Sequence, residues 1–106
     1  MYKQVNPFYL QKKWKHKRNV ILRRDNYECR ECKRYGRVMQ ATTVHHIYPL
    51  EEYPEYRLRT HNLISLCGNC HNMMHDRTTN DITPKGEQWQ ARVRKIVGGV
   101  KVKAER

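Results

Sequence analysis

The chain has 106 residues, of which 38% are hydrophobic, and a formal net charge of +12. This length predicts one small domain, for which a bound metal would supplement a modest hydrophobic core. The sequence has no apolar run of the roughly 18 residues that cross a membrane, and it begins without the apolar stretch of a secretory signal. We therefore expect a cytoplasmic protein whose four cysteines bind metal rather than form disulfides.

The positive charge is concentrated at the two ends of the chain. Residues 1–37 carry 12 Lys/Arg against 3 Asp/Glu, residues 38–80 carry 3 against 4, and residues 81–106 carry 7 against 3. Two basic flanks around a near-neutral centre favour a polyanionic partner, of which nucleic acid is the most common. An anionic membrane surface, or basic side chains that are merely solvated, are the alternatives.

The N-terminal third predicts a basic helix followed by a tight turn that carries cysteines. Asn6-Pro7 is a turn signal that can begin a helix, and Asp25-Asn26 is a signal that can end it. Between them, positions at helical spacing form one stripe among lysines and arginines: Trp14, Lys17, Ile21 and Leu22. The motif CRECKRYG at residues 29–36 then predicts a knuckle whose turn is closed by Gly36.

The centre of the chain predicts short strands and a long loop. Residues 38–47 are rich in β-branched side chains after Ala41 and predict two short strands around a bend. Residues 48–62 contain Pro49 and Pro54 among charged side chains and predict a loop, whereas residues 63–66 predict a further apolar strand. The combination of strands and helices predicts a small α+β domain.

The C-terminal part predicts two more helices. Residues 68–77 can form the first, and Thr83-Pro84 begins the second, which Gly98-Gly99 ends. The second helix has an apolar face that would pack on the core or, alternatively, form a dimer surface, and it consists of Trp89, Val93, Ile96 and Val97. Residues 101–106 are predicted to be a frayed basic tail.

The four cysteines form two Cys-x2-Cys pairs, Cys29 with Cys32 and Cys67 with Cys70. Each pair offers two thiolates at one backbone turn, and two such turns complete a tetrahedral cage that favours Zn²⁺ and leaves no open position. A redox pair and buried free thiols are the alternatives. Residues 67–71 also match the haem-attachment pattern CxxCH, but that chemistry requires export and would leave the first pair unexplained. We therefore predict a structural zinc ion.

Four histidines lie close to these cysteines in the sequence. His71 and His75 are four residues apart, which on a helix would place both rings on one face, as in other metal-binding pairs. His45 and His46 are adjacent, so in a strand they would face opposite sides of a sheet. One of these two could join the helical pair around a divalent ion, while the other stays unligated and takes a proton from water. Surface polarity and a polar strand end are the alternatives.

Together these residues resemble the HNH endonuclease family, also called ββα-metal nucleases. The resemblance rests on the two Cys-x2-Cys pairs, VHHI at 44–47, Asn62-Leu63 and LCGNCHNMMH at 66–75, with a lead-in at 8–29 similar to that of phage members. It implies an α+β fold in which a ββα-metal motif with zinc knuckles is flanked by N-terminal and C-terminal helices. It also implies a single nuclease domain over 1–106, made of a basic helical lead-in (1–28), a zinc-stapled core (29–77) and a C-terminal helix with a basic tail (78–106).

The resemblance also implies roles for individual residues. His46 matches the general base, and Asn62 matches a residue that in some members positions the loop holding the base and in others coordinates metal. His45, His71 and His75 match ligands of a catalytic divalent ion, although many members have Lys or Asn near the position of His75. The ion would be Zn²⁺, Mn²⁺, Ni²⁺, Co²⁺ or Mg²⁺, and neutral imidazoles favour the transition metals.

The activity that the resemblance implies is hydrolysis of DNA phosphodiester bonds, by nicking or double-strand cleavage, in phage DNA packaging or processing. The implied partners are DNA and phage terminase proteins in the host cytoplasm, with no membrane partner, for a monomer or weak dimer. DNA phosphates would contact basic residues near the first knuckle, namely Arg23, Arg24, Arg30, Lys33, Arg34 and Arg37. The alternatives are a non-catalytic zinc-stapled DNA-binding module and an RNA-directed or toxin nuclease.

Overall fold

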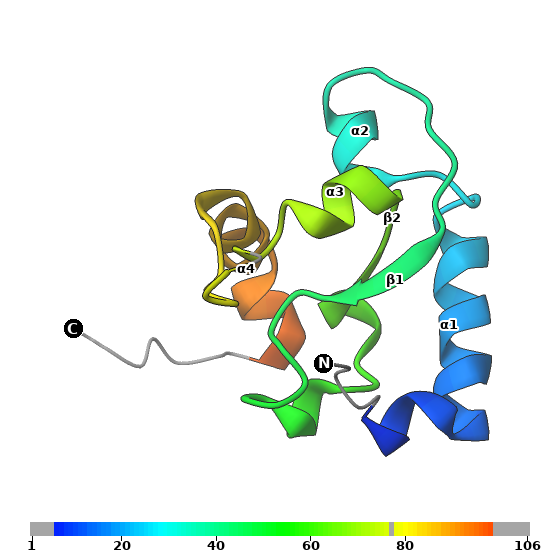
Figure 1. Cartoon of the computed structure of the whole chain (residues 1–106). Coiled ribbons are helices and arrows are strands. Elements are labelled where there is room, and N and C mark those ends of the chain that lie inside the picture. Colours follow the sequence, from blue (N-terminus) through cyan, green and yellow to red (C-terminus); the bar gives the residue numbers. More distant parts are fainter. Residues whose placement is uncertain (1–5, 77, 99–106) are drawn as a thin grey trace.

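The computed structural model describes residues 6–76 and 78–98. A two-stranded sheet lies at the centre, with α1 (Lys12–Arg24) on one side and α3 (Gly68–Asn72) and α4 (Pro84–Gly98) on the other (Figure 1). Helix α2 (Arg30–Arg34) lies beyond α3. The remaining elements are three short 3-10 helices, η1 (Pro7–Leu10), η2 (Pro54–Tyr56) and η3 (Thr60–Asn62). The predicted α+β class is confirmed, and the loop predicted for residues 48–62 contains the last two of these turns.

The sheet consists of β1 (Thr43–His46) paired antiparallel with β2 (Leu63–Leu66), in a register that places His45 opposite Ile64. The prediction of the apolar strand at 63–66 is confirmed, whereas the prediction of two strands within 38–47 is wrong. The strand is limited to residues 43–46, with one further bond from the Thr42 amide to the Leu66 carbonyl, whereas residues 39–41 bond to residues 27–29. The Cys29 amide donates to the Met39 carbonyl at 2.7 Å, which removes that segment from the sheet.

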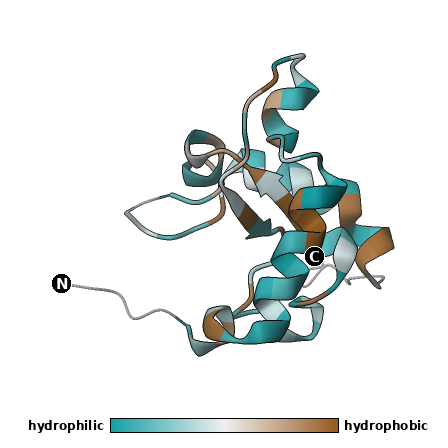
Figure 2. Cartoon of the chain, turned by 90° about the vertical axis from the view of Figure 1, so that its right-hand side faces the viewer, coloured by the Kyte–Doolittle hydropathy of each residue, from teal (hydrophilic) through white to brown (hydrophobic). Residues whose placement is uncertain are grey.

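Two hydrophobic clusters fill opposite faces of the sheet, because successive residues of β2 point to opposite sides. The cluster toward α1 contains Phe8, Trp14, Ile21, Leu22, Ala41, Val44 and Leu63. The cluster toward α3 and α4 contains the four cysteines with Ile47, Tyr48, Ile64, Leu66, Met74, Trp89 and Val97. The stripe predicted for α1 therefore faces the sheet, and the outward turns of this helix are mostly hydrophilic (Figure 2). On α4 the predicted face packs on the core except for Ile96, which is 58% exposed.

The N-terminal helix is divided into two parts. Asn6 begins η1, since its side-chain oxygen accepts a hydrogen bond from the Phe8 amide at 2.9 Å. Gln11 is extended and separates η1 from α1, so the helix expected from Asn6-Pro7 changes direction there. This change of direction brings the aromatic residues of η1 onto the start of α1 and beside β1, where Phe8 lies 5.4 Å from Trp14 between ring centroids.

The C-terminal end of α1 covers the outer edge of β2. Arg24 donates hydrogen bonds to the carbonyls of Thr60 at 2.9 Å and Leu63 at 2.7 Å. The Asp25 carboxylate accepts one from the Ser65 amide at 3.0 Å. These side chains satisfy backbone groups that an edge strand would otherwise leave unpaired. The free edge of β1 lies on the opposite side of the sheet.

Glu31 joins the first knuckle to α4 through a buried carboxylate that is 2% exposed. It accepts hydrogen bonds from Trp89 Nε1 at 2.9 Å and Lys85 Nζ at 2.6 Å, and it pairs with Arg34 at 3.2 Å. Burial alone would raise the pKa of Glu31, but the hydrogen bonds from Lys85 and Trp89 outweigh it and hold this pKa below its ordinary value. The carboxylate is therefore charged at neutral pH and holds α4 against α2.

Candidate active site

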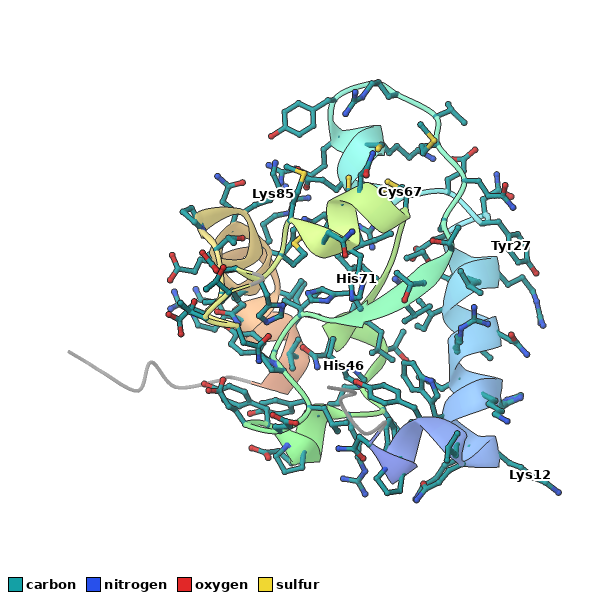
Figure 3. The ribbon with its side chains drawn as sticks, viewed as in Figure 1. Lys12, Tyr27, His46, Cys67, His71 and Lys85 are labelled. Atoms are coloured by element: carbon teal, nitrogen blue, oxygen red, sulfur yellow. The ribbon has the colours of Figure 1, made fainter. Side chains whose placement is uncertain are left out.

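The four cysteines lie together between α2 and the start of α3 (Figure 3). Their sulfur atoms all lie within 4.8 Å of one another, and the Cys32 sulfur is 3.9 Å from that of Cys67 and 3.7 Å from that of Cys70. The first knuckle is closed by Gly36, whose φ of +78° lies in the left-handed region that glycine adopts most easily. The two Cys-x2-Cys motifs therefore lie together in space, as predicted from the sequence.

The chemistry of this cluster suits a dication. Burial raises the pKa of the Cys32 and Cys70 thiols, and neighbouring sulfurs raise that of Cys70 further. Four thiolates so close together and so deeply buried would repel one another without a cation to offset their charge. A tetrahedral Zn²⁺ is the ion that such a set of sulfur ligands favours. The cluster therefore fits the structural zinc ion predicted from the sequence.

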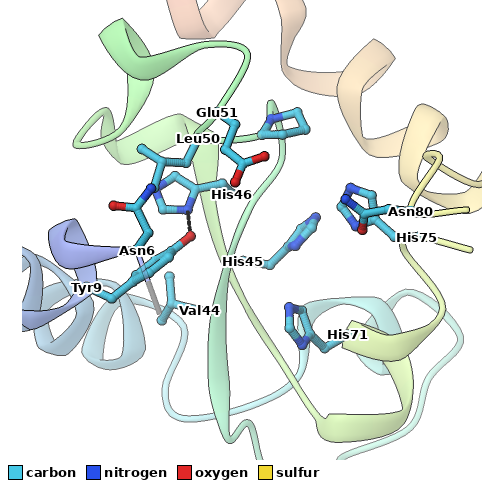
Figure 4. Close-up of a pocket in the computed structure, with 11 residues that line it drawn as sticks. Asn6, Tyr9, Val44, His45, His46, Leu50, Glu51, His71, His75 and Asn80 are labelled. Carbon is cyan, nitrogen blue, oxygen red and sulfur yellow. Dashed lines mark hydrogen bonds between the residues drawn. The ribbon is translucent and has the colours of Figure 1, made fainter. Parts of the chain in front are cut away.

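Three imidazole rings converge beside β1. His45 lies on β1, and its ring centroid is 5.5 Å from that of His71 on α3 and 5.8 Å from that of His75 (Figure 4). Burial, followed by the nearby rings of His71 and His75, lowers the pKa of His45 to about 3. Burial followed by the nearby His75 also lowers the pKa of His71. Both rings are therefore neutral at neutral pH, which is the form that binds a metal ion.

The prediction that His71 and His75 share one helical face is wrong. Helix α3 ends at Asn72, and His75 lies beyond it in an isolated antiparallel bridge with Ile82. The reason is a competing set of bonds from Thr83, whose hydroxyl donates to the Met73 carbonyl at 2.7 Å and whose amide donates to the Met74 carbonyl at 3.0 Å. These bonds take up the carbonyls that a longer helix would use.

Gly86 permits the close approach of α4 to the segment that carries His75. A Cβ atom at Gly86 would lie 2.7 Å from the Met74 carbonyl oxygen and 2.6 Å from Ile82 Cγ1. Any larger residue would therefore push α4 away from the backbone next to His75. A glycine near the start of a predicted helix gives no signal of this contact in the sequence, and we did not expect it.

His46 lies on the opposite side of β1 from His45, as adjacent strand residues should. Its ring stacks on Trp14 with centroids 5.0 Å apart and an interplanar angle of 23°. Its Nε2 lies 3.0 Å from the Arg57 carbonyl oxygen, and its Nδ1 lies 3.4 Å from the Tyr9 hydroxyl. Because a carbonyl only accepts hydrogen bonds, Nε2 carries the hydrogen and Nδ1 carries the lone pair. Burial lowers the pKa of His46, which keeps this ring neutral.

Asn62 is fully buried beneath the loop that follows β1. Its side-chain oxygen accepts from the Tyr48 amide at 2.8 Å, and its side-chain nitrogen donates to the carbonyls of Tyr48 at 3.1 Å and Tyr56 at 3.3 Å. Arg57, whose carbonyl accepts the hydrogen bond from His46, directly follows Tyr56. Both polar atoms of Asn62 are thus used to hold the loop, which favours the positioning role over metal coordination.

A pocket of about 200 Å³ at the free edge of β1 joins the two histidine environments. It is open to both His46 and the three converging rings (Figure 4). Its walls come from η1, β1, the following loop, α3 and the segment before α4, and they consist of Asn6, Tyr9, Val44, His45, His46, Pro49, Leu50, Glu51, His71, His75 and Asn80. The ring of His46 and the three converging histidine rings therefore face one opening.

Comparison with known proteins identifies the family. No curated protein matches the sequence. The family model described as HNH endonuclease matches residues 29–77. The crystal structure of the HNH endonuclease of deep-sea thermophilic bacteriophage GVE2 with manganese ion is 40% identical in sequence, with a TM-score of 0.61, over 61% of this chain and 71% of that chain. The chain belongs to the HNH endonuclease family.

The residues that the family model matches, 29–77, include the predicted metal ligands and the predicted base of this HNH protein. His45, His46 and Asn62 lie within residues 29–77, as do the four cysteines, His71 and His75. Tyr9 lines the pocket and Gly86 packs against the segment that carries His75, but both lie outside the matched range. Within residues 6–76 and 78–98, no helix has the length and apolar character needed to cross a membrane.

The six basic residues near the first knuckle of the HNH protein differ in their contacts. Four of them approach carboxylates: Arg24 and Arg30 at Asp25, Lys33 at Glu28, and Arg34 at Glu31. Arg23 and Arg37 are exposed, and their side chains form no hydrogen bond or ion pair within the described parts of the chain. These two are therefore the most available for an external phosphate.

Proposed function

We propose that this HNH protein hydrolyses phosphodiester bonds in DNA, with His46 as the general base and a divalent ion held by His45, His71 and His75. The observation that supports the proposal most directly is the orientation of His46. Its Nε2 donates to the Arg57 carbonyl at 3.0 Å, so the lone pair on Nδ1 faces the pocket in which the rings of His45, His71 and His75 converge.

In the proposed reaction, Nδ1 of His46 takes a proton from water, and the water oxygen forms a bond to phosphorus. The bond from phosphorus to the 3′ oxygen breaks, leaving a 5′-phosphate and, after protonation, a 3′-hydroxyl. The Arg57 carbonyl stabilises the positive charge on the His46 ring, and the stacked Trp14 keeps the ring plane fixed. A divalent ion bound by the three other histidines would supply positive charge that stabilises the phosphate and the leaving oxygen.

Two further parts of the protein have supporting roles in this proposal. Asn62 positions the loop that holds the partner of the base, through its bonds to Tyr48 and Tyr56. The four cysteines would hold a structural Zn²⁺, and this ion would fix α3, and therefore His71, against the sheet. This zinc ion takes no part in the chemistry.

We also propose a biological setting in phage DNA packaging or processing, together with terminase proteins, in the cytoplasm of the host. The support for this setting is the similarity to a bacteriophage HNH endonuclease. The net charge of +12 suits DNA as the substrate. One pocket cuts one strand, so a monomer would nick DNA, and a double-strand break would need two nicks or a weak dimer.

Plasmid relaxation tests the proposal. The purified protein, given Mn²⁺, Ni²⁺ or Mg²⁺, should nick supercoiled DNA, and His46→Ala should reduce the rate by about 10²- to 10⁴-fold because the base is lost. Elemental analysis should find the same metal content in both proteins, with one ion in each site. His16→Ala, at an exposed histidine of α1, is the matched control and should cut like the wild type.

Three results would separate the alternatives. Equal cutting by the wild type and His46→Ala would remove His46 from the role of base. A wild-type protein that binds DNA but cuts it with none of these ions would be a non-catalytic zinc-stapled module. Faster cleavage of RNA than of DNA would indicate an RNA-directed nuclease.

A further inference from the structure

Tyr9 brings a hydroxyl group into the pocket from outside residues 29–77, which the family model matches. It lies in η1, and its hydroxyl oxygen is 3.4 Å from Nδ1 of His46 (Figure 4). Its ring is held by edge-on contacts with three neighbours, at centroid distances of 5.6 Å from Phe8, 5.4 Å from Trp14 and 5.9 Å from His46. The position of the hydroxyl is therefore set by packing and does not depend on its bond to His46.

The atom that faces Tyr9 is the nitrogen that would accept the proton. Because Nε2 of His46 donates to the Arg57 carbonyl, Nδ1 is the nitrogen of this ring that carries a lone pair. A direct O–H···N hydrogen bond has a length of about 2.8 Å, so 3.4 Å is a weak direct contact. Two polar atoms 3.4 Å apart can, however, both lie about 2.8 Å from the oxygen of one water molecule.

We propose that Tyr9 is a positioning residue that orients the attacking water on Nδ1 of His46. The water donates one hydrogen to Nδ1 and the other to the phenol oxygen, which leaves an oxygen lone pair directed into the pocket toward phosphorus. The proton passes from water to Nδ1, the bond from oxygen to phosphorus forms, the bond to the 3′ oxygen breaks, and Tyr9 keeps its own hydrogen. This inference rests on the proposed function.

The surroundings of Tyr9 are consistent with a phenol that orients water and does not remove a proton itself. Burial, and then the negative charge of Glu51, raises the pKa of Tyr9, so the hydroxyl keeps its hydrogen at neutral pH. Glu51 also lines the pocket. The hydroxyl can therefore accept a hydrogen bond from water on one side and donate its own hydrogen on another.

The test is Tyr9→Phe, which removes the hydroxyl and leaves the ring contacts with Phe8, Trp14 and His46 in place. The kcat for plasmid nicking should fall by about 10- to 100-fold, because the water loses one of its two fixed partners. The KM for DNA, the affinity for Mn²⁺ measured by calorimetry and the melting temperature should stay at their wild-type values. Tyr27→Phe, at a tyrosine that is 52% exposed, is the matched control and should leave kcat unchanged.

A double variant distinguishes positioning from a merely structural effect. If Tyr9 acts only through the water that His46 activates, Tyr9→Phe should slow the His46→Ala protein no further. An unchanged kcat in Tyr9→Phe would overturn the inference, and so would a higher kcat, which would mean that the hydroxyl blocks the base. Additive losses, or a lowered melting temperature, would also overturn it. Failure of the proposed function can be told apart from failure of this inference. If the wild type does not cut DNA, both the proposed function and the role of Tyr9 are rejected. If the wild type cuts DNA but Tyr9→Phe gives one of the contrary results, only the role of Tyr9 is rejected.

Discussion

His45 and His46 are neighbours in the chain, but their rings lie in different environments on the two sides of β1. His45 faces the rings of His71 and His75, whereas His46 stacks on Trp14 and bonds to the loop after β1. The alternation of side chains along a strand is sufficient to separate the two rings. The free edge of β1 then allows both to reach one pocket. A single dipeptide can therefore supply a metal ligand and an unligated base.

At the scale of single residues, Asn62→Ala should weaken both the fold and the proposed activity. The change removes the partner of the Tyr48 amide and of two loop carbonyls, all of which are buried or partly buried. We expect the free energy of unfolding to fall by about 2–4 kcal/mol, measured by urea denaturation. Nicking should slow as well, because the loop that carries the Arg57 carbonyl is no longer held.

Asn19→Ala is the control for this measurement, because Asn19 is exposed on α1. It should change the free energy of unfolding by less than about 0.5 kcal/mol. An Asn62→Ala protein that is as stable as the wild type would show that the three hydrogen bonds do not hold the loop.

At the scale of elements, the site depends on how short α3 is. The helix carries His71 and ends at once, so the chain can turn back through the bridge of His75 with Ile82 and lead into α4. Thr83 then bonds the start of α4 to the carbonyls of residues 73 and 74, and Gly86 permits the close approach. His71 and His75, the two proposed metal ligands four residues apart, therefore come from one helical and one extended position.

Gly86→Ala tests whether this contact positions His75. The added methyl group would meet the Met74 carbonyl oxygen at 2.7 Å, so α4 and the segment before it must move apart. We expect a loss of stability of about 1–3 kcal/mol and an affinity of the histidine site for Ni²⁺ that is about 10-fold lower. Calorimetric titration with Ni²⁺ measures this affinity, and the zinc content of the cysteine cluster should not change.

Gly68→Ala provides the control, since nothing lies within 4 Å of a Cβ atom at that glycine. Its Ni²⁺ affinity should equal that of the wild type. Equal Ni²⁺ affinities of Gly86→Ala and Gly68→Ala would mean that His75 does not depend on the approach of α4.

At the scale of the whole molecule, the two edges of the sheet differ in what lies against them. The edge of β2 is covered by Arg24 and Asp25, which bond to the Leu63 carbonyl and the Ser65 amide. The edge of β1 carries the pocket. Basic residues of one region of the sequence therefore divide into those that stabilise the fold and those that remain available for DNA.

Salt dependence of DNA binding tests this division, using the His46→Ala protein so that the DNA stays intact. Arg23→Gln and Arg37→Gln should each reduce the slope of log affinity against log salt concentration by about one, because each removes one phosphate contact. Arg24→Gln should instead lower stability by about 1–3 kcal/mol, because the carbonyls of Thr60 in η3 and Leu63 in β2 lose their donor. Fluorescence anisotropy at several salt concentrations measures the slopes. Unchanged slopes in the first two variants would remove Arg23 and Arg37 from the DNA contacts.

The sequence by itself determined the features that depend on short spacings. Two Cys-x2-Cys turns, the helical stripe of α1, the apolar run of β2 and the adjacent histidines of β1 are all local patterns, and each is present in the structure. Local geometry decides such features, because a turn, a helix or a strand places nearby side chains in the same way wherever it lies. The family resemblance is carried by these same patterns.

Only the tertiary structure decided which distant groups meet in the pocket. Thr83 sets the end of α3, Gly86 permits the close approach of α4, Asn62 holds the loop after β1, and Tyr9 places a hydroxyl beside His46. Each of these contacts joins residues that are at least nine positions apart or that come from separate elements. These contacts depend on how the helices, strands and loops pack against one another. The order of residue types along the chain does not predict that packing.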